Sequence, residues 1–181
     1  SAIVTLSGAG QLQNSTTYFF SVRGSNDQGS VTITTDGVFV DLEEPKISSV
    51  TEFKNDLDWF GPTIDGHIFA NASDNGGITK YEFSIGSSAG LDDIVSWTVS
   101  DSNSFLADVS SLSEDVTYYS NARVTDVVGN IVTQSSDGFK MDVTNPILGN
   151  ISIGNEYQSD TSKVTYVWSD FDDLHSGIAD Y

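Results

Sequence analysis

The sequence predicts an all-β protein made of tandem antiparallel β-sandwiches, and two observations lead to this prediction. First, short stretches rich in β-branched and aromatic residues alternate with turns rich in glycine, serine and aspartate, and no stretch has the period of an amphipathic helix. Second, the chain repeats itself after about 100 residues. Three sets of residues recur 100 or 101 positions later. Leu12 and Tyr18 recur as Leu112 and Tyr118, and Gly77, Ile78 and Tyr81 recur as Gly177, Ile178 and Tyr181. The third set, Asp36, Gly37, Asp41 and Pro45, recurs as Asp137, Gly138, Asp142 and Pro146.

The strands of the central repeat follow one another at the spacing of a sandwich. Residues 78–85 alternate apolar and polar side chains, which is typical of a half-buried strand, and the glycine- and serine-rich residues 86–90 end it. The other strands are expected, in order, at residues 46–51, 66–72, 94–99, 104–109 and 116–124, with residues 131–134 and 138–141 making the last one. About seven strands in roughly 100 residues are typical of an antiparallel sandwich.

A leucine followed, after five residues, by a tyrosine resembles the tyrosine corner of fibronectin type III domains. The pair is Leu112 and Tyr118 in the central repeat, and Leu12 and Tyr18 in the earlier copy. In this family the leucine enters the core and the tyrosine hydroxyl bonds to nearby backbone. The resemblance therefore implies that Tyr118 is buried, with its hydroxyl bonded to backbone near Leu112.

Further motifs extend this resemblance to the whole chain. Residues 118–130 are similar to the strand and turn that close such domains in bacterial surface proteins, and residues 137–146 resemble the final strand and the linker after it. The second strand of the family usually carries a core tryptophan, which Trp168 matches, whereas Ile68 and Phe69 stand there in the central repeat. The resemblance implies three units: the C-terminal half of one fibronectin type III-like domain (1–44), a complete domain (45–144) and the N-terminal part of a further domain (145–181).

The composition is strongly acidic and contains no cysteine. With 26 Asp+Glu against 7 Lys+Arg, the formal charge is -19 and the sequence pI is near 4.1. Such a field repels nucleic acid and anionic lipid and attracts cations. The absence of cysteine excludes a disulfide framework, a thiolate zinc site and a thiol nucleophile. No apolar run reaches the roughly 18 residues of a membrane span, so no membrane insertion of this segment is expected.

One stretch formally matches a catalytic motif. Residues 86–90 read G-x-S-x-G, which presents Ser88 as a nucleophile only where a strand turns sharply into a helix, and strands are expected on both sides here. The two histidines, His67 and His175, are expected in the preceding strand and in a different unit, with no second histidine or cysteine at ligand spacing. The sequence therefore predicts a protein without catalytic residues.

Two acidic stretches begin like the calcium loop of an EF-hand, and both fail its pattern. The stretch from Asp56 has Phe60 at the fifth position of the loop and His67 at the twelfth, so two ligands are missing. The stretch from Asp170 has His175 where the loop requires glycine.

The fold suggests a different arrangement of acidic groups. In fibronectin-like domains, the loops between the second and third and between the sixth and seventh strands face the incoming linker. Acidic and amide side chains are therefore expected to converge in two groups, Asp74, Asn75, Asp126 and Asn130 with Asp41, Glu43 and Glu44, and Asp170, Asp172 and Asp173 with Asp142 and Asn145. Such oxygens repel one another unless a cation joins them, and calcium prefers hard oxygen ligands. The alternative, solvated loops that serve solubility, stays open.

Uninterrupted repetition favours a structural role. The sequence predicts a non-catalytic structural or adhesive stalk segment of a large repetitive bacterial or archaeal cell-surface or secreted protein, with calcium as its expected cofactor. The alternatives are a spacer module of a secreted polysaccharide-degrading enzyme, and a surface-layer or ligand-binding module. The expected partners are neighbouring repeats of the same chain and surface glycans or proteins, at the cell surface or outside the cell.

Overall fold

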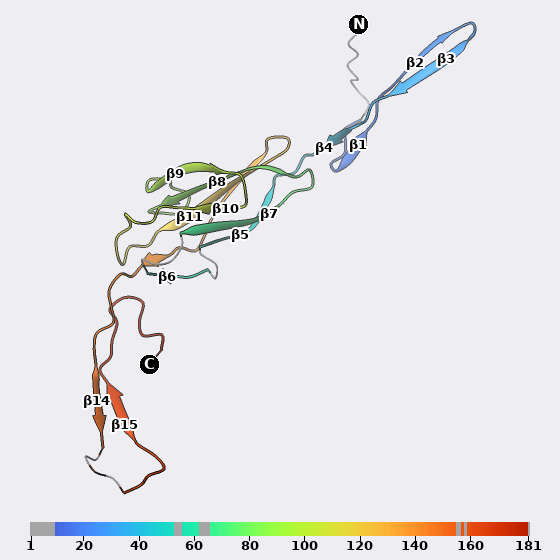
Figure 1. Cartoon of the computed structure of the whole chain (residues 1–181). Helices are drawn as coiled ribbons and strands as arrows, with labels where there is room; N and C mark the ends of the chain where they lie inside the picture. Colours follow the sequence, from blue (N-terminus) through green and yellow to red (C-terminus); the bar gives the residue numbers. More distant parts are fainter. Residues whose placement is uncertain (1–9, 53–55, 62–65, 155–156, 158, 181) are drawn as a thin grey trace.

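The structure is a computed structural model of the chain, and it describes residues 10–52, 56–61, 66–154, 157 and 159–180. These residues are organised in strands and connecting turns, and they contain no helix. The all-β prediction is therefore confirmed. Figure 1 shows a central body of packed strands, with one hairpin extending from it at the N-terminal side and another at the C-terminal side.

The strands of the described residues, in chain order, are β1 (Thr16–Tyr18), β2 (Ser21–Asn26), β3 (Gly29–Thr34), β4 (Val38–Val40), β5 (Lys46–Glu52), β6 (Trp59–Phe60), β7 (His67–Ser73), β8 (Ile78–Gly86), β9 (Val95–Ser100), β10 (Ser104–Leu106), β11 (Tyr119–Asp126), β12 (Ile131–Ser135), β13 (Lys140–Met141), β14 (Asn150–Ile153) and β15 (Tyr166–Ser169). The β1 strand pairs with β4, β2 with β3, and β14 with β15, all antiparallel.

The central body consists of two antiparallel sheets with the strand orders β10-β7-β5 and β12-β11-β8-β9. Both sheets contribute side chains to one hydrophobic core, as in a β-sandwich. Its buried members are Ile47, Val50, Phe60, Ile68, Ala70, Phe83, Ile85, Ala107, Tyr118, Ala122, Val124, Phe139 and Met141. Ile68, which stands where the following repeat has Trp168, is a buried member of this core, while Trp59 and Trp97 are only partly buried.

Three of the predicted strands differ clearly from the observed ones. The last strand, expected over residues 131–134 and 138–141, is divided into β12, which pairs with β11, and β13, which pairs with β6. The strand expected at 104–109 is only Ser104–Leu106, and the one expected at 116–124 begins later, at Tyr119. The later start has a physical reason, because Tyr118 pairs with Phe139 in an isolated bridge instead of joining β11. The chain reaches that bridge through Asp115, whose φ of 55° is incompatible with a strand.

The sequence did not predict β6, a two-residue strand that pairs parallel with β13. Phe60 enters the core and packs against Phe139 at a ring centroid distance of 5.3 Å. Trp59, on the other side of the strand, lies under the Lys140 ammonium at 5.2 Å. The segment is therefore held by alternate side chains, one buried and one covered by a cation.

The expected corner at Tyr118 is confirmed. Tyr118 is 6% exposed, and its hydroxyl accepts a hydrogen bond of 3.1 Å from the N–H of Ser113, the residue after Leu112. The earlier copy has the same bond, 2.8 Å long and exposed, from the N–H of Gln13 to the Tyr18 hydroxyl. Each copy is followed by a glycine with a φ of 103°, Gly138 in the central body and Gly37 before it, a conformation that other residues rarely adopt.

We expect Tyr118→Phe to lower the free energy of unfolding by about 1–2 kcal/mol, because the Ser113 N–H loses its partner in a partly buried site. Urea unfolding followed by fluorescence measures this loss. Tyr157→Phe, at a site that is 86% exposed, is the matched control and leaves the midpoint unchanged. Equal stability of the Tyr118→Phe variant and the wild-type chain would show that the corner does not stabilise the fold.

Candidate metal centre

The pairing of β8 with β11 brings two turns of the central body together. These strands are antiparallel, and Ile78 at the start of β8 lies opposite Asp126 at the end of β11. The turn before β8 (74–77) therefore adjoins the turn after β11 (126–130), and the Val127 N–H donates to the Gly77 carbonyl at 3.1 Å. Both turns face the incoming linker, residues 41–45. We call the linker and the two turns the first joint.

Carboxylates shape both turns. Asp74 Oδ1 accepts hydrogen bonds from the N–H groups of Gly76 (2.8 Å) and Gly77 (3.0 Å). Asp126 Oδ1 accepts three backbone N–H bonds in the same way, from Val128, Gly129 and Asn130 at 2.6–2.9 Å. A turn closed on a carboxylate in this manner fixes the position of that carboxylate.

Asp126 is a buried carboxylate that stays ionised. Its side chain is 2% exposed, and burial by itself raises its pKa. The hydrogen bonds from the Asn130 side chain and from the backbone N–H groups of the turn outweigh that effect, so the pKa lies below its ordinary value. Asp126 therefore brings a full negative charge into the first joint.

The linker is attached to these turns by direct hydrogen bonds. Asn130 Nδ2 donates to the Glu43 carbonyl and to Asp126 Oδ2, each at 2.8 Å. Asn75 Nδ2 donates to the Ser15 hydroxyl, also at 2.8 Å, and so connects the same end of the central body to the turn before β1. The two asparagines therefore attach the linker and the turn before β1 to the same end of the central body.

Three carboxylates meet where the linker enters. One oxygen each of Asp41, Asp74 and Asp126 lie within 4.8 Å of one another. Asp41 is 8% exposed, its Oδ1 accepts the Glu43 N–H at 3.2 Å, and its Oδ2 is buried without a hydrogen-bond partner in the described part of the chain. None of the ion pairs found among the described residues involves these three carboxylates.

The other residues expected at this joint lie elsewhere. The side chains of Glu43 and Glu44 are exposed and outside the carboxylate group, and Glu43 takes part through its backbone carbonyl. Asn75 points to Ser15. The structure thus brings together three of the five carboxylates that the sequence predicted for this joint, and it uses Asn130 as the bridge to the linker.

The second joint, residues 142–146 with residues 173–177, is built differently. Asp142 is 9% exposed, but both its oxygens are used, Oδ1 by the Thr144 N–H at 2.9 Å and Oδ2 by the Ser176 N–H at 3.1 Å. Hydrogen bonding by Ser176, against the effect of burial, lowers the pKa of Asp142. Asp173 lines the same small pocket, of about 220 Å³, and its Oδ1 accepts the N–H groups of His175 and Gly177.

The remaining candidates at the second joint do not converge on Asp142. Asp170 accepts hydrogen bonds from the Asn150 side chain at 3.0 Å and the Ser169 hydroxyl at 2.8 Å. Asp172 accepts the N–H of Asp173 and pairs through its backbone with Ile147. In the described residues, these oxygens serve local turns and do not form a group of metal ligands.

A second acidic group, which the sequence analysis missed, contains Glu52, Asp56 and Asp137. Glu52 is 1% exposed, and its Oε1 accepts hydrogen bonds from the Ser136 hydroxyl and from the Ser120 N–H. Burial raises the pKa of Glu52 more than these bonds lower it, so the pKa lies above its ordinary value. The strand was expected to end at residue 51, so Glu52 was not placed on a face, although it lies two positions after the core residue Val50 and therefore on the same side of β5.

The G-x-S-x-G stretch forms a loop between two strands. Ser88 lies between β8 and β9, its carbonyl accepts the Leu91 N–H, and the neighbouring Ser87 hydroxyl donates to Asp93 at 2.7 Å. His67 stacks on Phe69 within β7. The strand-to-helix turn that a nucleophilic serine requires is therefore absent at this stretch.

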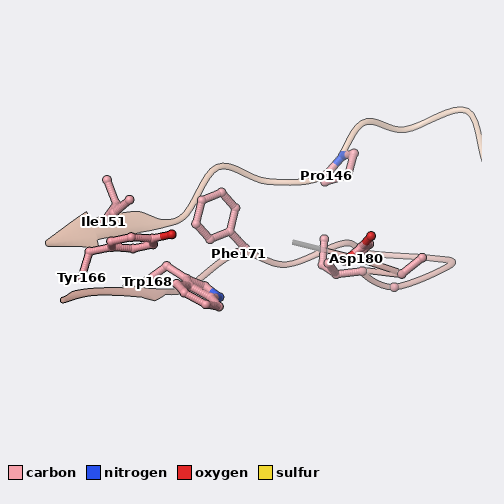
Figure 2. Close-up of a pocket in the computed structure, with 9 residues that line it drawn as sticks. Pro146, Ile151, Tyr166, Trp168, Phe171 and Asp180 are labelled. Atoms are coloured by element: carbon pink, nitrogen blue, oxygen red, sulfur yellow. The ribbon is translucent and has the colours of Figure 1, made fainter. Parts of the chain in front are cut away.

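An apolar pocket of about 610 Å³ lies beside the C-terminal hairpin. Figure 2 shows the side chains that gather there, with Ile151, Tyr166, Trp168 and Phe171 beside the two strands and Pro146 and Asp180 at the other end. Trp168 is 47% exposed and lies 100 positions after Ile68, which is a core residue of the central body.

Comparisons with protein-family models, curated proteins and solved structures gave no match. In the part of the chain that the structure describes, no helix is long and apolar enough to cross a membrane.

Glu52→Gln is expected to raise the melting temperature at neutral pH by a few degrees. The pKa of Glu52 is raised in the folded state, so its stabilising effect is fully present below the unfolded pKa and is lost as pH rises through the folded pKa. Glutamine keeps an acceptor for Ser120 and Ser136 but carries no charge. Thermal unfolding as a function of pH measures the difference, which should disappear at acidic pH.

Glu44→Gln, which removes the same charge at an exposed site, is the control and should show no such pH-dependent gain. If Glu52→Gln lowered the melting temperature at neutral pH, the folded protein would stabilise the ionised carboxylate of Glu52. That result would contradict a raised pKa for this group.

Proposed function

We propose that this chain is a non-catalytic structural or adhesive spacer made of tandem fibronectin type III-like sandwiches, exposed at a cell surface or secreted. Residues 1–44, 45–144 and 145–181 are then parts of three successive units. The recurrence of local structure supports this division. The tyrosine corner and the glycine at a φ of 103° occur in both the first and the second unit. Such an array separates whatever lies at its two ends.

The observation that carries the proposal is the first joint. A freely jointed linker would leave its backbone solvated, whereas here Asn130 and Asn75 bond the linker side to the central body. Pro45 is buried at the end of the linker and restricts the backbone of the preceding residue. These contacts favour one orientation between neighbouring units, which a spacer needs if it is to hold a fixed length.

The apolar pocket fits this proposal without a ligand. Trp168 corresponds to Ile68 and Ile178 to Ile78, and both of the earlier residues pack in or against the core of the central body. The pocket is therefore assigned to the inner face of the third sandwich, where other strands of that unit would cover it. This assignment favours a spacer over a module that binds a ligand there.

The proposal predicts one preferred distance across the first joint. Because the chain has no cysteine, spin labels can be attached at Asp27→Cys, in the β2–β3 turn, and Asp92→Cys, in an exposed loop of the central body. Electron–electron double resonance in millimolar calcium should give a narrow distribution with a single peak. Removing both asparagine contacts, with Asn75→Ala and Asn130→Ala, should broaden it.

Asn71→Ala in the labelled chain is the control, since Asn71 is an exposed asparagine of β7 outside the linker and the two turns of the first joint. It should leave the distribution unchanged. A wild-type distribution as broad as that of the double variant would contradict the spacer proposal, because the units would then swing freely.

A further inference from the structure

We propose that the carboxylates of Asp41, Asp74 and Asp126 form a calcium site that ties the linker to the central body. The site goes beyond the spacer role, because a cation that binds there makes the geometry of the first joint depend on the ions in the medium. It takes one ligand from the linker and one from each of the two turns that face it.

The charge balance of the site requires a cation. Three carboxylates with oxygens within 4.8 Å repel one another, and burial of Asp41 and Asp126 removes most of the water that would screen them. None of the ion pairs among the described residues brings a basic side chain to these three carboxylates. A divalent ion supplies the missing positive charge.

A second observation points to a ligand at the same place. Asp41 Oδ2 has no hydrogen-bond partner although it is buried, and a buried carboxylate oxygen without a partner is costly. This oxygen lies against the Asp74 turn, 2.5 Å from the position that a Cβ on Gly76 would take. It therefore points into the space between the linker and that turn, where the other two carboxylates lie.

The dimensions of the site favour calcium. Calcium binds oxygen at about 2.3–2.6 Å in flexible geometry, so oxygens up to roughly 5 Å apart can share one ion. Magnesium requires bonds of about 2.0–2.1 Å in a near-ideal octahedron and keeps several waters. Three carboxylates on a linker and two turns, all closed by backbone hydrogen bonds, offer irregular oxygen ligands of the kind calcium accepts.

At the second joint, a backbone N–H binds the carboxylate oxygen that corresponds to Asp41 Oδ2. Asp142 lies 101 positions after Asp41, and its Oδ2 accepts the N–H of Ser176, the residue 100 positions after Gly76. At the first joint, the Gly76 N–H is used by Asp74, and Asp41 Oδ2 stays unpartnered. The first joint therefore leaves a buried carboxylate oxygen without a partner, whereas the corresponding oxygen of the second joint is bonded to backbone.

Calorimetric titration of the 181-residue chain with calcium chloride, at physiological ionic strength and after removal of metal by a chelator, tests the proposal. We expect one saturable site with a Kd on the order of 10⁻⁴–10⁻³ M, as in extracellular calcium modules, and weaker binding of magnesium. Calcium should also raise the melting temperature, since it binds only the folded arrangement.

Three variants and a control make the test specific. Asp41→Asn and Asp74→Asn each remove a ligand charge and should weaken calcium binding at least tenfold. Gly76→Ala leaves the net charge unchanged but places a methyl group against Asp41 Oδ2, and should weaken binding to a similar degree. Asp92→Asn removes an exposed charge away from the joint and should bind as the wild-type chain does.

Circular dichroism establishes whether each variant is folded. If Gly76→Ala does not fold, the two asparagine variants still test the proposal. In chelator, Asp41→Asn should melt above the wild-type chain because it relieves the repulsion. Absence of saturable calcium binding in the wild-type chain, equal binding of magnesium, or unchanged binding in both asparagine variants would overturn the proposal. If calcium binding were confirmed in this way but the distance distribution between the spin labels were broad, the cation site would be supported and the spacer role would be contradicted.

Discussion

The Asp126 carboxylate is the constraint on which the first joint depends. Its three backbone hydrogen bonds close the turn after β11, and the same turn presents Asn130 to the Glu43 carbonyl of the linker. The carboxylate therefore does two things at once, since it sets the turn that holds the linker and carries a buried negative charge to the place where the linker arrives. The attachment of the linker and the proposed cation site therefore have the same origin.

The core of the central body makes this arrangement possible. The β8 and β11 strands pair in one register from Tyr119 opposite Gly86 to Thr125 opposite Lys80, and buried side chains enforce that register. A shift of one residue would turn Phe83 and Val124 out of the core. After Thr125 the register shifts by one residue, which brings Asp126 opposite Ile78 and sets the place of the two adjacent turns. The position of the acidic turns is thus a consequence of hydrophobic packing, and their charge is tolerated at the rim of the sandwich because the core supplies the stability.

The sequence predicted the features that a regular pattern of side chains or the repeat marks, and it missed features that fell outside such a pattern. Period-two alternation located β8, and the expected topology brought Asp41, Asp74 and Asp126 together although they are far apart in the chain. Strand β6 was missed because two residues have no periodicity. The inward side chain of Glu52 was missed because that strand was expected to end at residue 51, although Glu52 lies two positions after the core residue Val50 and so on the same face of β5. For Glu43, the sequence predicted a carboxylate ligand, whereas the structure uses its backbone carbonyl, which every residue possesses.

The central claim is that the linker and the two turns act as one unit around a cation, and nuclear magnetic resonance of the ¹⁵N-labelled chain during a calcium titration tests it most directly. The account predicts that the amide signals of Glu43, Gly77 and Gly129 shift together, with one shared midpoint, while those of the exposed residues Asp27 and Asp92 stay in place. Shifts spread evenly over the exposed acidic residues, or separate midpoints for the linker and the turns, would contradict it.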